Sequence, residues 1–321
     1  MSSGRRGVRP LRLLLTLLVV GGSLVFLGVR FAGAWRELAE RSPRWNWGMV
    51  ALAVVAALPW FALRVRLWQE ALRTMCEAPP YRRAVSLWSL SELGRYLPGA
   101  GMHLVGRAVA ARWGGWRAAH TIVASLLELA TTAVAAAALA LGLAGESIGL
   151  PAPWGALAAA VLLLGAGVAL FRPRWWTPLA NRLLVRLKRQ PIDIDMTPAV
   201  AMRLVLLALA AWASLGAAFV LFVGAMEPAG TPLATILIGS PAAALRVIGQ
   251  FAMAWLVGMA IIVAPAGIGV RETVLATLLT PTLGPVGALL AALASRLWLT
   301  VSEILFVGLS LLIHPRESGR A

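Results

Sequence analysis

The hydrophobic residues of this chain gather in long runs that are separated by short polar stretches rich in arginine. A helix needs about 20 apolar residues to cross the hydrocarbon core of a bilayer, and most runs approach or exceed that length. The predicted full spans are 13–29, 48–68, 118–145, 154–171, 199–224, 246–263 and 286–313. The pattern predicts an all-α fold: a polytopic integral membrane helical bundle with about seven or eight transmembrane helices and two broken or re-entrant segments.

One break interrupts the hydrophobic pattern late in the chain, in the segment 263–284. It contains Pro265, Gly267 and Gly269 within a few residues. Proline cannot donate a backbone hydrogen bond and restricts the residue before it, and glycine adopts backbone angles that other residues avoid. A helix should therefore end near Ala264, and a new one should begin near Gly269.

The first turn of that new helix contains Arg271 and Glu272. Its free amides and positive dipole end would face whatever binds there, and an anionic group is the natural ligand. The helix continues only to about residue 283, which is too short to cross a membrane alone. The alternative is a helix that simply stops and restarts at the membrane surface.

An earlier break, in the segment 84–109, has the same parts. Pro98 and Gly99 interrupt it, and Arg95 and Arg107 flank the break. Non-helical backbone at membrane depth is tolerated only where it is buried in protein or lines a cavity, so we expect a re-entrant hairpin that turns at the proline and glycine. Paired interrupted segments in the two halves of a membrane protein point to a transport site.

An acidic residue lies in the middle of the predicted span 118–145. Glu128 shares one helix face with Thr121, Ser125 and Thr132. An ionisable residue at this depth costs about 2.5 kcal/mol or more unless it is paired or hydrated. Glu128 is therefore a functional candidate, and the alternative is a structural salt bridge to an arginine of a broken segment. Both interpretations place it in the interior of the bundle.

Charged residues also occur in the second and the last spans. Arg296 and Glu303 lie two turns apart in the span 286–313, too far for the usual pair on one helix, so each should contact another helix or a ligand. Arg64 and Arg66 lie near the inner end of the second span, and we expect both to extend toward the aqueous surface.

Arginine-rich loops set the predicted topology. Arginines precede the first run, which favours a retained first helix with its N-terminus in the cytoplasm; a cleaved signal peptide is the alternative. The loop that contains Cys76 should face the cytoplasm, and the segment 172–190 should lie on the inner membrane surface. A cytoplasmic C-terminus would require the short hydrophobic piece 232–245 to cross as well.

Composition narrows the classes of function. The 321 residues carry a net charge of +16, yet only 13% are charged, against about a quarter in a soluble domain. Anionic lipid headgroups, and not nucleic acid, are the expected partners of these arginines. One cysteine excludes an intramolecular disulfide, the three histidines show no ligand spacing, and no catalytic motif is present. We therefore expect no metal or cofactor.

Taken together, the two breaks resemble the flippase-like family of the lysylphosphatidylglycerol synthase transmembrane region. The matching motifs are Arg95-Tyr96-Leu97-Pro98-Gly99, Gly106-Arg107, Ser125 to Glu128, Pro265 to Glu272, and Arg296. Ala266 and Ile268 replace the glycine and leucine that are usual in the late motif. The resemblance covers nearly the whole chain, in the same order and spacing.

The resemblance implies a single transmembrane domain over residues 1–321, in the cytoplasmic membrane of a bacterium, that translocates a lipid between leaflets. It implies an anionic phospholipid or isoprenoid-linked lipid as substrate, and no lysyl transfer, because the chain ends at Ala321 without an aminoacyl transferase domain. A transporter is favoured over an enzyme. A membrane-embedded enzyme of lipid or polyprenyl-phosphate metabolism, a scaffold and a homo-oligomer stay open.

A flippase must carry a polar headgroup through hydrocarbon, where an unpaired charge is costly. Arginine holds phosphate bidentately and stays charged, and acidic residues would balance it in the empty state. We expect such a path to contain the prolines and glycines of the breaks. We also expect it to contain Arg95, Arg107, Glu128, Arg271, Glu272, Arg296 and Glu303.

Overall fold

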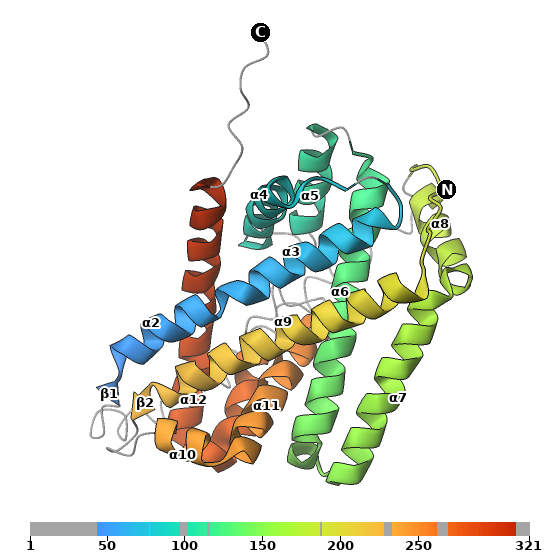
Figure 1. The fold of residues 1–321 in the computed structure, drawn as a ribbon. Helices are drawn as coiled ribbons and strands as arrows, with labels where there is room; N and C mark the ends of the chain where they lie inside the picture. The colour runs from blue at the N-terminus through green and yellow to red at the C-terminus, as the bar shows by residue number, and fades with distance from the viewer. Residues whose placement is uncertain are drawn as a thin grey trace, which may run out of the picture. The chain divides into compact units, whose positions relative to one another are not determined.

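The computed structural model describes residues 44–76, 78–96, 102–113, 116–186, 188–227, 233–261 and 269–312. Almost all of this part of the chain is helical (Figure 1). The one sheet within it pairs two short antiparallel strands, β1 (Arg44–Trp45) and β2 (Met226–Glu227). The predicted all-α fold is confirmed, and the first predicted span, 13–29, lies outside the described residues.

The helices follow the hydrophobic runs of the sequence. They are α2 (Trp47–Ala56), α3 (Leu58–Arg73), α4 (Tyr81–Glu92), α5 (Met102–Trp113), α6 (Ala118–Ala144), α7 (Ala152–Phe171), α8 (Thr177–Arg186), α9 (Pro198–Gly224), α10 (Leu233–Gly239), α11 (Pro241–Ala260) and α12 (Val270–Leu312). In the described part, six stretches are long and apolar enough to cross a membrane: α2 with α3, α6, α7, α9, α11 and α12. The chain is a multi-pass membrane protein.

The hydrophobic piece 232–245 does not form a single helix. Its first half forms α10, a helix of only seven residues, and seven residues rise by about 10 Å against a hydrocarbon core of about 30 Å. Its second half belongs to α11. The side chain of Ser240 accepts a hydrogen bond from the backbone of Ala243, and Pro241 occupies the first helical turn, so a new helix begins there.

The late break lies between α11 and α12. Helix α11 ends at Ala260, a few residues before the predicted end. Helix α12 begins at Val270, as predicted, directly after Gly269, whose positive φ of 85° suits glycine. Pro265 and Gly267 lie outside the described residues.

Helix α12 consists of two helical stretches that meet at a kink. At Gly284 the backbone leaves the helical region, with φ 69° and ψ 168°, and Pro281 and Pro285 flank it. Proline removes a helical hydrogen bond and glycine accepts the positive φ. The kink confirms the predicted short helix after the break and the separate last span.

The early break lies between α4 and α5. A 3₁₀ turn, η1 (Leu93–Tyr96), ends the first arm, and the predicted turn residues Pro98 and Gly99 lie outside the described residues. The two helices pack against each other, and a Cβ atom on Gly106 would lie 4.0 Å from the backbone of Ser91. This packing is the arrangement that a hairpin requires.

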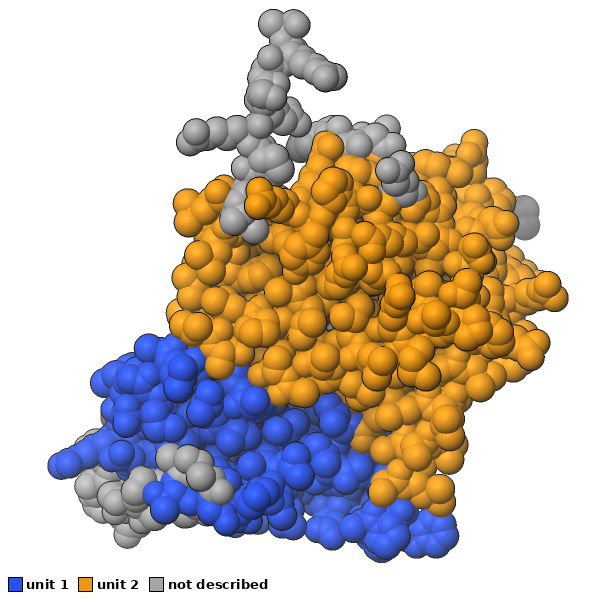
Figure 2. Space-filling view, in the orientation of Figure 1, with its two compact units in different colours: residues 1–53, 139–155, 216–299 blue, residues 54–138, 156–215, 300–321 orange. Residues whose placement is uncertain are grey.

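The chain divides into two compact units that alternate along the sequence, coloured separately in Figure 2. Unit 1 comprises residues 1–53, 139–155 and 216–299, and unit 2 comprises 54–138, 156–215 and 300–321. Helices α2, α6, α7, α9 and α12 contribute residues to both.

The core of unit 1 is aromatic and closely packed. The rings of Phe219 and Phe251 stack with their centroids 4.0 Å apart. A Cβ atom on Gly249 would lie only 2.8 Å from Ala144, so the absence of a side chain lets α11 approach the end of α6. Small residues at helix contacts are the usual means of close packing in membrane proteins.

The core of unit 2 also depends on aromatic rings. Trp60 meets Trp212 edge to face at 5.1 Å, and Phe61 stacks with Phe306 at 5.3 Å. The indole of Trp212 donates a 2.9 Å hydrogen bond to the backbone carbonyl of Thr132 in α6. These contacts fix α3 against α6, α9 and the end of α12.

The loop after α3 offers a test of topology through Cys76. If this loop faces the cytoplasm, a membrane-impermeant maleimide should label Cys76 in inverted or opened vesicles only. Burial raises the pKa of the Cys76 thiol, and the nearby Arg117 offsets this only in part. The thiolate is the nucleophile, so labelling should accelerate as the pH rises from about 7 to about 9.

Two results would contradict this account of Cys76. Rapid labelling in right-side-out vesicles would overturn the topology from the second span onward. A labelling rate that does not change with pH would contradict the raised pKa.

Candidate functional site

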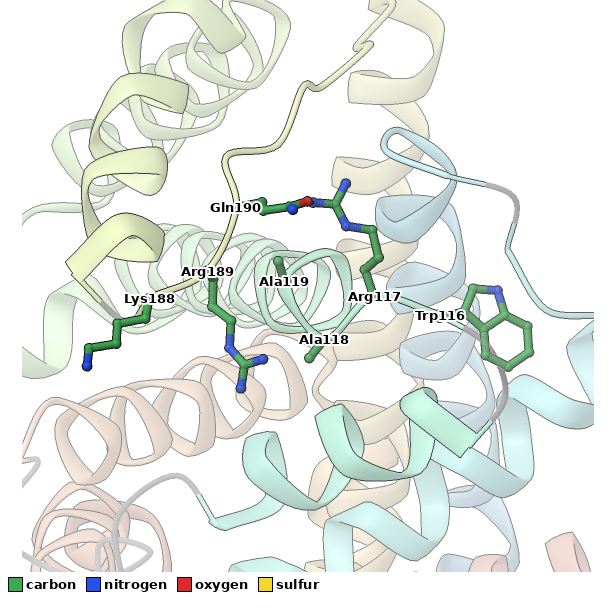
Figure 3. Close-up of a pocket in the computed structure, with 7 residues that line it drawn as sticks. All are labelled: Trp116, Arg117, Ala118, Ala119, Lys188, Arg189 and Gln190. Atoms are coloured by element: carbon green, nitrogen blue, oxygen red, sulfur yellow. The ribbon is translucent and has the colours of Figure 1, made fainter.

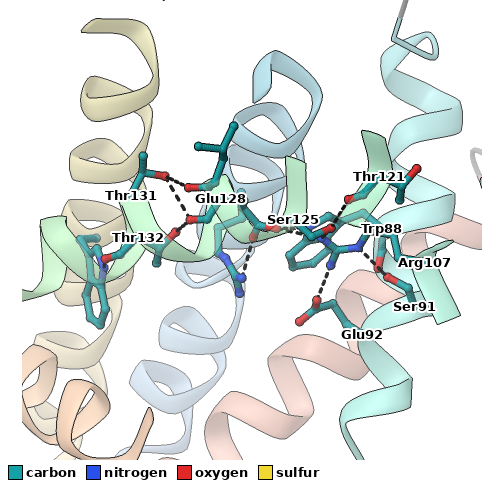
Figure 4. A network of polar contacts seen from close by, with 12 residues as sticks. Trp88, Ser91, Glu92, Arg107, Thr121, Ser125, Glu128, Thr131 and Thr132 are labelled. Atoms are coloured by element: carbon teal, nitrogen blue, oxygen red, sulfur yellow. Dashed lines mark hydrogen bonds and ion pairs between the residues drawn. The ribbon is translucent and has the colours of Figure 1, made fainter. Parts of the chain in front are cut away.

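The guanidinium of Arg107, in α5, is enclosed by polar groups of α4 and α6 (Figure 4). It donates to Glu92 at 2.5 Å and to Glu128 at 2.8 Å. Two hydroxyl groups complete the set, Ser91 at 3.0 Å and Ser125 at 3.1 Å. Arg107 is 1% exposed, so its charge is satisfied entirely by the protein's own groups.

Glu128 joins this set to α3 and α4. One carboxylate oxygen lies 2.6 Å from Nη2 of Arg64. The other accepts from Arg107 and from the indole of Trp88, the latter at 3.2 Å. Both Arg64 and Glu128 are buried. The predicted salt bridge between Glu128 and an arginine of a broken segment is confirmed, and a second arginine shares the carboxylate.

Tryptophan rings surround the two arginines. The Arg64 guanidinium lies 5.3 Å from the ring centre of Trp60 and 5.0 Å from that of Trp88. The Arg107 guanidinium lies 5.1 Å from Trp88 and 5.6 Å from Trp68. An aromatic face stabilises a desolvated cation by about 2 kcal/mol. We name Arg64, Glu92, Arg107 and Glu128 the Glu128 cluster; its formal charges sum to zero.

The polar face predicted for α6 is buried, as expected, but its hydroxyls donate hydrogen bonds to backbone carbonyls of the same helical stretch. Thr121, Ser125 and Thr132 each donate to the carbonyl four residues earlier. Such bonds satisfy a hydroxyl without a partner from another helix. Ser125 in addition accepts from Arg107. Glu128 is therefore the residue of this face that connects the helices.

A second cluster, in unit 1, forms where α12 begins. Glu272 accepts a 2.7 Å hydrogen bond from the backbone N–H of Gly269, so the third residue of the helix caps its own N-terminus. The other carboxylate oxygen of Glu272 pairs with Arg296 at 3.2 Å, across the kink at Gly284. We name Gly269, Arg271, Glu272 and Arg296 the Glu272 cluster.

Arg271 lies beside that cap and is buried. Its guanidinium sits 4.8 Å from the ring centre of Phe251 in α11. A Cβ atom added to Gly258 of α11 would lie 3.0 Å from the Cβ atom of Arg271, so α11 passes close to the start of α12. The sequence predicts an anionic ligand at this helix N-terminus. In the structure, the protein's own carboxylate, Glu272, occupies that position.

The structure thus brings the predicted residues together in two sets. Arg107 and Glu128 meet in unit 2, and Glu272 and Arg296 meet in unit 1, where Arg271 packs against Phe251. Glu303 is buried in unit 2. Arg95 lies in η1 and its side chain is not among the described ones, and Pro98, Gly99, Pro265 and Gly267 lie outside the described residues.

Sequence reasoning missed three members of the unit 2 site: Arg64, Glu92 and Trp88. The prediction that Arg64 extends to the aqueous surface is wrong, because its buried guanidinium pairs with Glu128. Arg66, two residues later, has its side chain 41% exposed and pairs with Glu70 of its own helix at 3.0 Å. The two arginines lie on different helix faces, a signal available from their spacing.

The described residues include no group of three or more histidine, cysteine, aspartate or glutamate side chains that could hold a metal ion. No protein-family model matches the chain, and no curated protein matches it either. The interpretation of the two clusters therefore rests on their chemistry.

The Glu128 cluster makes a prediction about stability. Glu128→Gln leaves Arg64 without its carboxylate while Arg107 keeps Glu92. Removing one partner of a buried pair is costly, so the free energy of unfolding should fall by about 3 kcal/mol. Adding Arg64→Gln should restore part of this loss, because no unpaired charge then remains. Reversible unfolding in detergent measures each variant of the cycle.

Arg66→Gln is the matched control for that cycle, since it removes an exposed arginine from the same helix. In the Glu128→Gln background it should restore nothing. A Glu128→Gln protein as stable as wild type, or equal rescue by Arg64→Gln and Arg66→Gln, would show that the buried pair does not hold the helices together.

Proposed function

We propose that this protein binds a lipid with an anionic headgroup and moves it between the leaflets of a bacterial cytoplasmic membrane. The observation that carries the proposal is the Glu272 cluster: a carboxylate placed where a helix N-terminus and an arginine favour an anion. Arginine binds carboxylate and phosphate with the same paired geometry. A headgroup phosphate can therefore replace the carboxylate contact by contact.

The balance of charge supports this exchange. Moving a phosphate into hydrocarbon is unfavourable unless cations meet it there. Arg296 pairs with Glu272 close to the start of α12 in the empty state, and the buried cation Arg271 precedes Glu272 in the same helical turn. When a phosphate enters, Arg296 exchanges one anionic partner for another, and Glu272 keeps its hydrogen bond from the N–H of Gly269. Arg296 is therefore never left without an anionic partner.

The Glu128 cluster supports the same chemistry in unit 2. Arg107 belongs to the helix that follows the early break, and its four polar partners are side chains that can exchange for phosphate oxygens. The tryptophan rings beside Arg64 and Arg107 keep water away from both cations. Each cluster would act as one clamp on a headgroup.

The resemblance of the two breaks to the flippase-like family of the lysylphosphatidylglycerol synthase transmembrane region adds to the proposal. The residues that carry the resemblance include Arg107, Glu128, Glu272 and Arg296, and all four make ion pairs in these clusters. An anionic phospholipid or an isoprenoid-linked phosphate would suit both clamps, since each carries the phosphate that arginine recognises.

The proposal is tested by substitutions at Arg271. Arg271→Lys keeps the charge but loses the paired donors, and Arg271→Ala loses both. Retention of phosphatidylglycerol by the purified protein should fall in the order wild type, lysine, alanine, and each lost contact should cost about 1.5–3 kcal/mol. Movement of a fluorescent phosphatidylglycerol between leaflets of proteoliposomes should fall in the same order.

Arg246→Ala is the matched control, because Arg246 also belongs to unit 1 but makes an exposed ion pair with Glu146. It should leave binding and translocation unchanged. Normal lipid binding by Arg271→Ala at an unchanged melting temperature would refute the clamp. Mass spectrometry of the recovered lipid separates the alternatives, since a chemically altered lipid would indicate an enzyme.

A further inference from the structure

A cavity of about 380 Å³ lies in unit 2, between the start of α6 and the segment that follows α8 (Figure 3). Its lining residues are Trp116, Arg117, Ala118, Ala119, Lys188, Arg189 and Gln190. They are different residues from those of the Glu128 and Glu272 clusters. The volume is within the range of small-molecule sites.

The lining of this cavity is strongly positive. It includes three cations, Arg117, Lys188 and Arg189, and no acidic residue. Within the described part of the chain, none of the three forms an ion pair with a carboxylate. Arg117 donates a 2.6 Å hydrogen bond to the side-chain oxygen of Gln190, a neutral partner that leaves its charge uncompensated. The first turn of α6, at Ala118, adds its amides and the positive end of a 27-residue helix.

Lys188, which lines the cavity, lies at a turn of the chain in a conformation that favours glycine. Lys188 has a positive φ of 56°. The N–H of Lys188 donates to the carbonyl of Val185, and the N–H of Arg189 donates to the carbonyl of Leu184. These two hydrogen bonds form a Schellman motif at the end of α8. A side chain at this position is strained. Lys188 is also the only lysine in a chain whose other basic residues are arginines.

The wall that carries these cations is held in place. Asn181 of α8 both donates to and accepts from the backbone of Ile192, at 3.0 and 2.9 Å. The side chains of Ile192 and Ile194 are buried, and the N–H of Asp195 donates to the carbonyl of Thr74 at 2.8 Å. The backbone of the segment after α8 is therefore anchored on both sides.

We propose that this cavity is a binding site for a phosphate group. Two arginine forks, one amine and a helix N-terminus together are the donor set that phosphate prefers. The group could belong to a lipid headgroup, since the segment 172–190 is expected at the inner membrane surface, or to a small phosphorylated solute. The inference does not depend on lipid translocation.

The test measures how inorganic phosphate, at constant ionic strength, raises the melting temperature of the purified full chain. Lys188→Gly and Arg189→Gln should each raise the phosphate concentration needed for half of the effect by about tenfold, because each removes one charged contact. Lys188→Gly also relieves the strained φ, so its own melting temperature should not fall. Weaker binding by a protein of undiminished stability cannot be attributed to unfolding.

Arg182→Gln is the matched control, because it removes an exposed arginine of α8 that does not line the cavity. A second readout, native mass spectrometry, counts phosphatidylglycerol and phosphatidylcholine retained from mixed micelles. Loss of the phosphate effect identifies a site for free phosphate compounds, and loss of phosphatidylglycerol retention identifies a headgroup site. If neither readout changes in Lys188→Gly and Arg189→Gln, or if Arg182→Gln has an equal effect, the proposal is wrong.

Discussion

A charge buried among membrane-spanning helices must be paired, and much of this molecule's interior follows from that constraint. Arg64, Arg107 and Glu128 are all nearly inaccessible, and each meets an opposite charge within 3 Å. Their pairing ties α3, the early hairpin and α6 into one unit. In the other unit, Glu272 pairs with Arg296 across a kink and caps the helix that starts at Gly269. Hydrophobic packing alone would not specify these helix contacts, because lipid tails are as apolar as the side chains.

The proposed function uses the same pairing for anion exchange. An arginine that holds a carboxylate can hold a phosphate in the same way, so under this proposal an internal carboxylate would take the place of the ligand in the empty state. Burial beside Trp88 in one cluster and Phe251 in the other limits competition from water. The arginines that stabilise the empty protein are therefore the same ones that would bind an anionic headgroup under the proposed function.

The sequence predicted the helices well because long apolar runs leave few alternatives in a membrane. One of its two interpretations of Glu128, a salt bridge to an arginine of a broken segment, matches the pair with Arg107. The sequence did not indicate that Ser240 and Pro241 start a new helix inside one hydrophobic run, and it was wrong at Arg64. The burial of Arg64 depends on which face of α3 meets Glu128, a tertiary fact that hydropathy does not contain. The sequence likewise could not show that Glu272 itself occupies the predicted anion position, because this depends on the three-dimensional structure.

The central claim is that Glu272 holds the place of a lipid phosphate, and the affinity of Glu272→Gln for phosphatidylglycerol tests it most directly. Glutamine keeps the side-chain oxygen that accepts the Gly269 hydrogen bond, so the helix cap should survive, but the competing negative charge is gone. The account predicts that the purified variant retains phosphatidylglycerol on the order of tenfold more tightly than wild type, since an ionic contact no longer has to be displaced. Unchanged or weaker retention, at an unchanged melting temperature, would contradict the claim and leave Glu272 as a structural residue.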